Sequence, residues 1–239
     1  GMVSWWTGDQ NANDFVGSNH GTYTGAYVPG KIGSAFAISG QGNDFVTVPQ
    51  SASLESATVT VDAWVQANGS PGNFKYLASK GGKGCEGGAS YALYTGRDGG
   101  LAFYVYDGNS FIVSPAVPAS TIWDNQWHLV AGTYDGSSVS LYLDGNLVGS
   151  SAASLTINYQ LTNNQFAIGQ YLDCPSQNLG FKGNIDEVEV FSRALSAAEI
   201  QSLYQADAAG KCNINIDVKH HHHDRCIHLK NKGNISVSI

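Results

Sequence analysis

The amino-acid sequence predicts an all-β sandwich of two antiparallel sheets with one short helix near its C-terminal end. Residues 3–209 consist of short runs that alternate between apolar and polar residues, separated by turns rich in Gly, Asn and Asp, and this pattern is typical of a sandwich. The chain has 239 residues, and only 13% of them are charged, about half the usual share for a soluble domain. A chain of this length can bury a substantial core within one all-β domain.

The expected strands each show a period of two. Val59, Val61, Ala63 and Val65 occupy alternate positions and should share one face of a strand. Asp-Gly pairs at 98–99 and 144–145 predict tight hairpins. The other strands are expected at 35–38, 45–48, 91–94, 101–106, 127–134, 139–143, 166–168 and 185–191.

One helix is predicted after the last of these strands. Ser196 is followed three residues later by Glu199, which is a capping-box pattern. Leu195, Ile200 and Leu203 then recur at helical spacing. This helix is expected to close one end of the sandwich.

The charge balance and the length of the apolar runs exclude two classes of partner. Twelve Lys and Arg residues stand against 19 Asp and Glu residues, a formal net charge of −7, so the chain lacks the positive field that holds nucleic acid. No apolar run approaches the roughly 18 residues that a membrane-spanning helix needs, so membrane insertion is not expected.

The last thirty residues differ in composition from the rest. Residues 210–239 hold five of the seven histidines, and we expect a tail, a linker or a vector-derived extension rather than part of the domain. His220–His223, together with Cys226 and His228, could bind zinc or nickel, although four consecutive histidines are more typical of an expression tag. The start at Gly1-Met2 resembles a tag-cleavage remnant, so a signal peptide is expected to have been removed.

The four cysteines form an even set without the C-x-x-C spacing of a metal site. Three disulfide pairings are possible, and free thiols are the alternative. We favour Cys85 with Cys174, because both lie in Gly-rich loop stretches rather than in strand patterns. The Gly, Ser, Thr and Asn content, with few Lys and one Met, favours a secreted or cell-surface protein, where disulfides persist.

Four segments in a fixed order resemble a known family. They cover residues 5–22, 30–49, 127–145 and 183–196. Together they resemble a laminin G-like domain of the concanavalin A-like lectin/glucanase superfamily, over about residues 3–209. The resemblance implies a two-sheet jelly roll that is usually a non-catalytic module of a larger secreted or cell-surface protein, often with a bound calcium ion.

A structural calcium ion is predicted at Asp9, Asn11, Asp14 and Asp186. The first three place oxygen-bearing side chains within six residues of a Gly- and Asn-rich loop, as a hard cation requires. The strand order of the resembling fold would bring the first strand beside the last and let the carboxylates converge. The alternative is an Asx-turn loop, whose carboxylates cap backbone N–H groups.

Asp186 adds a second argument for a cation. Strand alternation places it on one face with Val188 and Val190, at the margin of apolar packing. An unpaired carboxylate would be costly to bury there, and a cation removes that cost.

The segment 184–189 invites comparison with the catalytic strand of laminarinase-type glycosidases, which carry Glu-x-Asp-x-Glu or Glu-x-Asp-x-x-Glu. Asn184 stands where the first carboxylate is needed, and Val188 stands at its i+4 partner position. The chain also lacks Gly-x-Ser-x-Gly, a phosphate loop and His-Glu-x-x-His. We therefore do not expect an enzyme, and a glycoside hydrolase of the same fold is a distant alternative.

Carbohydrate binding is the expected function, because sugars bind to aromatic faces flanked by amides and carboxylates. Three loop groups combine these features: Trp123 with Asp124 and Asn125, Tyr106 with Asp107 and Asn109, and Tyr171 with Asp173, Asn178 and Phe181. The alternative for each ring is that it covers the core or a hairpin end. Trp5, Trp64 and Trp127 are expected to lie in the core, because each sits inside an alternating strand. An adhesion or structural module that contacts an extracellular protein is the second function class, and fold alone does not separate the two.

Overall fold

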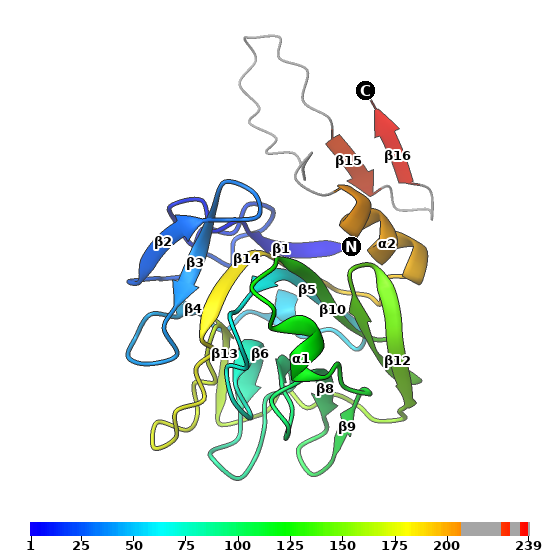
Figure 1. The fold of residues 1–239 in the computed structure, drawn as a ribbon. Coiled ribbons are helices and arrows are strands. Elements are labelled where there is room, and N and C mark those ends of the chain that lie inside the picture. The colour runs from blue at the N-terminus through cyan, green and yellow to red at the C-terminus, as the bar shows by residue number, and fades with distance from the viewer. Residues whose placement is uncertain (207–225, 230–234, 239) are drawn as a thin grey trace.

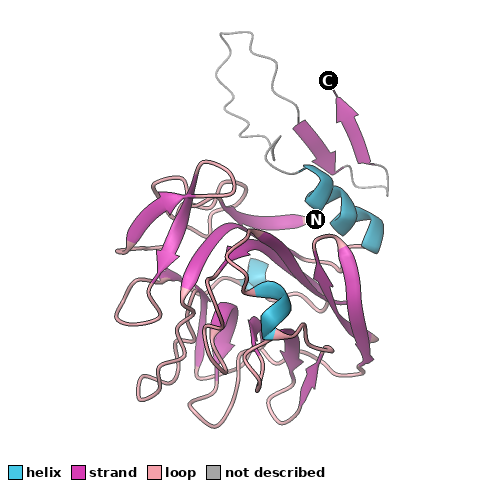
Figure 2. Ribbon diagram, in the orientation of Figure 1, coloured by secondary structure: helices cyan, strands magenta, loops and turns pink. Residues whose placement is uncertain are grey.

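Two antiparallel sheets make up the sandwich (Figures 1 and 2). The structure is a computed structural model, and it describes residues 1–206, 226–229 and 235–238. The large sheet has eight strands in the order β12-β11-β10-β5-β14-β3-β2, with β1 also paired to β14. The small sheet has six strands in the order β4-β13-β6-β7-β8-β9. The all-β sandwich with little helix is therefore confirmed.

The strands of the large sheet are β1 (Met2–Trp6), β2 (Ala26–Pro29), β3 (Ser34–Ile38), β5 (Val59–Gln66), β10 (His128–Tyr134), β11 (Ser138–Leu143), β12 (Asn146–Ala152) and β14 (Gly183–Phe191). Those of the small sheet are β4 (Val46–Val48), β6 (Tyr76–Gly82), β7 (Tyr91–Thr95), β8 (Leu101–Tyr106), β9 (Phe111–Val113) and β13 (Asn163–Ile168). The helices are η1 (Ala52–Leu54), a 3₁₀ turn, with α1 (Ala119–Ile122) and α2 (Ala197–Ala206). A separate pair, β15 (Cys226–Leu229) and β16 (Ile235–Ser238), lies in the C-terminal region. The histidine run His220–His223 lies outside the described residues.

The main core lies between the two sheets. Val59, Val61, Ala63 and Val65 of β5 all face it, as their alternation predicts. Opposing sheets meet through large rings, and the Trp6 and Phe166 rings stack with their centroids 5.0 Å apart. The alternate positions of β5, including Trp64, consequently face outward.

Helix α2 covers part of the outer face of the large sheet. Leu195, Ile200 and Leu203 pack there against Trp64 and Phe191 in a second apolar cluster. The predicted capping box is present, because the Ser196 hydroxyl accepts from the Glu199 amide at 3.3 Å and the Glu199 carboxylate accepts from the Ser196 amide at 2.8 Å. The expectation that this helix closes an end of the sandwich is wrong, since its apolar side faces the sheet.

The outer face of the small sheet carries a third cluster, made of tyrosines. Its rings are Tyr76, Tyr94, Tyr104, Tyr106 and Tyr171. Two loops are tied together over this face by a disulfide between Cys85 and Cys174, which confirms the favoured pairing. No helix among the described residues is long and apolar enough to cross a membrane.

A bulge in β14 changes which residues share a face. The register with β5 shifts between Asp186 and Glu189, and Glu187 has a φ of 52°. Asp186 therefore pairs with Trp64 on the outer face, whereas Val188 and Val190 belong to the main core. The expectation that Asp186 shares a face with these valines is wrong, because the extra residue inverts the alternation.

Candidate binding face of the large sheet

Two of the four predicted calcium ligands converge next to the turn between β2 and β3. The Asp186 carboxylate accepts from the Ile32 amide at 3.0 Å, and the Asp9 carboxylate accepts from the Ser34 amide at 2.8 Å. A side chain at Gly30 would place its Cβ 2.6 Å from an Asp186 carboxylate oxygen, so only glycine fits there. The glycine turn thus wraps both carboxylates.

Asp186 is the less favourably placed carboxylate of this pair. Its side chain is buried, and Oδ1 has no hydrogen-bond partner. Burial raises the pKa of Asp186 to about 7, and Asp9 adds to the rise, while backbone amides of Ile32, Glu187 and Lys31 oppose it. A buried oxygen of this kind is destabilising unless it is protonated or meets a cation.

The other two predicted ligands have different roles. The Asp14 carboxylate accepts from the backbone amides of Trp5 at 3.0 Å, Val16 at 3.0 Å, Gly17 at 2.9 Å and Asn19 at 3.0 Å. The Asn11 side chain accepts from the Asn13 amide and donates to the Asp9 carbonyl. Turn chemistry therefore already uses both side chains, as the Asx-turn alternative describes.

The aromatic rings predicted to hold sugar are buried. Trp123, Tyr106 and Tyr171 are each 4% exposed, and Phe181 is fully buried. Each polar ring atom also has an internal partner: Trp123 donates to Gly99, Tyr106 to Gly108 and Tyr171 to Gly84. These rings offer no free face, so they fit the alternative that they cover the core.

The polar residues next to these rings serve mainly to close turns. The Asp107 carboxylate accepts from the Asn109 and Ser110 amides, which hold the pKa of Asp107 below its ordinary value. Asp173 accepts from the Gly84 amide, and Asn178 accepts from the Gly180 amide. Asn125 differs from them, since it lines an open hollow.

This hollow, here called the amide groove, has a volume of about 530 Å³ where strands β3, β5 and β14 meet the loop before β10. Four of its lining residues carry side-chain amides: Gln66, Asn68, Asn125 and Asn184. The Asn184 amide donates to Gln66 at 2.9 Å, and the Gln66 amide donates to the Asn125 carbonyl at 3.0 Å. These bonds hold the side-chain amides of Gln66 and Asn184 in place before any ligand arrives, and Asn125 takes part through its main-chain carbonyl.

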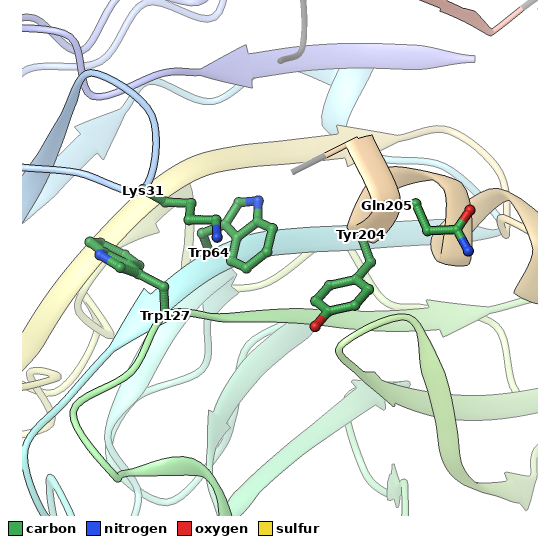
Figure 3. Close-up of a pocket in the computed structure, with 5 residues that line it drawn as sticks. All are labelled: Lys31, Trp64, Trp127, Tyr204 and Gln205. Carbon is green, nitrogen blue, oxygen red and sulfur yellow. The ribbon is translucent and has the colours of Figure 1, made fainter. Parts of the chain in front are cut away.

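A second hollow of about 240 Å³, the aromatic pocket, lies beside α2. Lys31, Trp64, Trp127, Tyr204 and Gln205 line it. Figure 3 shows Lys31 extended over Trp64, with Trp127 on one side and Tyr204 pointing down from α2 on the other. The Lys31 ammonium lies 4.4 Å from the Trp64 ring centroid. Trp127 is only half-buried, and it packs against the outer apolar cluster beside α2 rather than lying inside the main core as expected.

The sequence contains one signal for this pocket. The alternation that places Ala63 and Val65 of β5 inside also places Trp64 outside, where a large ring needs cover. Nothing local indicates that Lys31 and Tyr204, far from Trp64 in the chain, supply that cover. The pocket depends on strand order and on where α2 packs.

His128 lies at the start of β10, between two carboxylates. One ring nitrogen lies 2.8 Å from Asp144 and the other lies 3.1 Å from Asp124. A neutral imidazole can donate only once, so this arrangement favours the imidazolium. Hydrogen bonding to Asp144 and then to Asp124 raises the pKa of His128 above its ordinary value, against the opposing effect of burial.

We expect His128 to make stability depend on pH near neutrality. Because its pKa is raised in the folded chain, its contribution is fully present below the unfolded value of about 6.5 and is lost as pH rises through the folded value. The free energy of unfolding, measured by urea denaturation from pH 6 to 8.5, should therefore fall more steeply in the wild type than in His128→Gln. Equal slopes for the two proteins would contradict this role.

Comparisons with known proteins agree with this architecture. A family profile described as the concanavalin A-like lectin/glucanases superfamily matches residues 40–201. No curated protein matches the sequence.

Several solved structures share the fold. Domain 4 of AbnA, a GH43 extracellular arabinanase from Geobacillus stearothermophilus, solved in complex with arabinotriose, has a TM-score of 0.63 and 22% identity, covering 85% of this chain and 98% of that domain. The binding domain of Paraclostridial Mosquitocidal Protein 1 has a TM-score of 0.64 and 17% identity, covering 86% of this chain and 52% of that one. The receptor binding domain of botulinum neurotoxin D has a TM-score of 0.63 and 16% identity, covering 86% of this chain and 52% of that one.

This chain thus spans nearly all of the arabinanase domain but about half the length of the toxin domains. At these identities the similarity shows the fold alone. The family profile, by contrast, covers more than half of the 239 residues. The chain belongs to the concanavalin A-like lectin/glucanase superfamily.

Proposed function

We propose that this chain is a non-catalytic extracellular module that binds carbohydrate at the amide groove. The observation that carries the proposal is the hydrogen-bonded pair of side-chain amides of Asn184 and Gln66, tied to the main-chain carbonyl of Asn125, which lines an open hollow of about 530 Å³. Fixed amides can donate to and accept from sugar hydroxyls without first losing side-chain freedom. The disulfide supports an extracellular location, and a domain of an extracellular arabinanase shares the fold.

Asn184 also bears on the non-catalytic part of this proposal. It stands where a retaining glycosidase of this fold would need a carboxylate, and its amide is hydrogen-bonded to Gln66. An amide cannot act as the nucleophile of such an enzyme. The groove is therefore suited to holding a glycan rather than cleaving it.

A glycan array followed by isothermal titration tests the binding proposal. The array should give at least one oligosaccharide that binds, and Asn184→Ala and Gln66→Ala should each weaken its binding about tenfold, the usual worth of one or two hydrogen bonds. Gln50→Ala, which removes an exposed amide after β4, is the matched control and should bind normally. A silent array, or equal binding by all variants, would overturn the proposal.

We also propose that Asp9 and Asp186 hold a structural calcium ion. The unpartnered Oδ1 of Asp186 and the glycine turn around both carboxylates support this assignment. No group of three or more His, Cys, Asp or Glu side chains in the described part of the chain could hold a metal, so further ligands would be backbone or water oxygens, which calcium accepts. A bound calcium ion would supply positive charge to two clustered carboxylates.

The variant Asp186→Asn should separate the effect of bound calcium on stability from the effect of the buried carboxylate itself. At pH 8 in chelator, we expect the variant to melt at a higher temperature than the wild type. The reason is the raised pKa of Asp186, about 7: the metal-free folded state prefers the protonated acid, so stability falls as pH rises from about 4 through 7. Asparagine avoids that loss. Calcium should then stabilise the wild type, by about 2.7 kcal/mol at a hundredfold excess over Kd, and leave the variant unchanged.

Asp14→Asn is the control for this experiment. Its carboxylate accepts four backbone hydrogen bonds, so its loss should lower the melting temperature equally in calcium and in chelator. An equal calcium shift in wild type and Asp186→Asn would refute the site. So would a lower melting temperature for Asp186→Asn in chelator at pH 8.

A further inference from the structure

The amide groove and the aromatic pocket are built from the same segments. Strand β5 supplies Gln66 to the groove and Trp64 to the pocket. The loop before β10 supplies Asn125 to the groove and Trp127 to the pocket. In both segments the two residues are two positions apart, so the hollows are neighbours on one surface.

The strand register fixes how they follow one another. Asn184 pairs with Gln66, and Asp186 pairs with Trp64, on antiparallel strands β14 and β5. The intervening pair, Ile185 with Val65, faces the core. Gln66 and Trp64 are therefore successive outward positions, about 7 Å apart along the strand.

The two hollows offer complementary chemistry. The groove lining is rich in amides, hydroxyls and backbone, whereas the pocket lining is mainly aromatic. Trp64 itself is 2% exposed, because Lys31 and Tyr204 cover its ring. The rings that a ligand could reach are thus Trp127 and Tyr204, both half-buried.

We propose that groove and pocket form one cleft for a linear oligosaccharide of at least two sugar residues. One sugar is held by the groove amides, and the next packs its C–H face against Trp127 or Tyr204 in the pocket. This rests on the proposed function and extends it, because it adds a second subsite, the aromatic pocket, to the amide groove. The Lys31 ammonium, which borders the pocket, can donate to ring or hydroxyl oxygens.

The test compares sugars of different length on matched variants. The probes are arabinotriose, xylotriose, cellotriose and trigalacturonate, each with its own monosaccharide, titrated calorimetrically and by tryptophan fluorescence. The best trisaccharide should bind at least tenfold more tightly than its monosaccharide and should change the tryptophan emission. Trp127→Ala should remove most of that gain, and Trp127→Phe should keep most of it.

Controls distinguish the two proposals. Phe111→Ala removes an exposed ring from the small sheet and should bind like the wild type, and Tyr204→Ala serves as a second pocket variant should Trp127→Ala fail to fold. Trisaccharide binding that Gln66→Ala weakens but both pocket variants leave unchanged would overturn the two-subsite cleft and keep the groove. No binding of any trisaccharide, together with a silent glycan array, would overturn both.

Discussion

Glu55→Gln should lower the free energy of unfolding by about 3–5 kcal/mol, the usual result of removing one partner of a buried ion pair. The Lys80 ammonium lies 2.9 Å from Glu55, and the side chain of Lys80 is 0% exposed. Its other hydrogen-bond partner is the Asn164 carbonyl, at 2.6 Å. Burial lowers the pKa of Lys80 and Glu55 opposes that effect, so the variant leaves a buried cation without its counter-charge. Urea denaturation at pH 7 measures the loss.

A double variant tests the cause of this loss. Lys80→Met together with Glu55→Gln removes the buried charge as well as its partner, and replacing a whole buried pair is often close to neutral. We therefore expect the double variant to regain most of the stability that Glu55→Gln loses. A double variant less stable than Glu55→Gln would show that Lys80 contributes through packing and not through charge.

Removing the disulfide should cost about 2–5 kcal/mol, the usual range for a native bridge. Cys85 and Cys174 are separated by 89 positions in the chain, so the bridge restricts a long segment of the unfolded state. The double variant Cys85→Ser/Cys174→Ala should therefore melt roughly 5–15 °C below the wild type in a calorimetric scan. Since the Tyr171 hydroxyl and Asp173 also hold Gly84, the fold itself should survive.

The same disulfide variant tests whether the outer face of the small sheet, here called the tyrosine face, takes part in glycan binding. The bridge ties two loops over the outer face of the small sheet, whereas the groove and the pocket lie on the large sheet. Glycan affinity at 20 °C should be unchanged. A large loss of affinity in a folded variant would show that the binding site lies on the small sheet and would contradict its assignment to the large sheet.

The sequence predicts most strands because alternation records which face is buried. The four inward positions of β5 and the capping box at Ser196 are each confirmed by the structure. The bulge in β14 could not be foreseen, because its left-handed residue is Glu187 rather than glycine. One extra residue was enough to move Asp186 to the outer face.

The candidate site was harder to predict than the strands, because residues of the same type in the same loop make different hydrogen bonds. Asp9 and Asp14 lie in the same loop, yet only Asp14 is saturated with backbone amides. Which of the two carboxylates is surrounded by backbone amides depends on how the loop packs against β1. The amide groove likewise joins Gln66 to Asn184 across 118 positions of sequence, and such a contact depends on strand order rather than on local pattern.

Nuclear magnetic resonance mapping tests the central claim, that glycan binds on the outer face of the large sheet. Nitrogen-labelled protein is titrated with arabinotriose and with the oligosaccharide that binds best on the array. The claim predicts that the side-chain amide signals of Gln66, Asn125 and Asn184 and the indole signal of Trp127 shift together. Shifts confined to the tyrosine face, at residues such as Gly84 and Asp107, would contradict it.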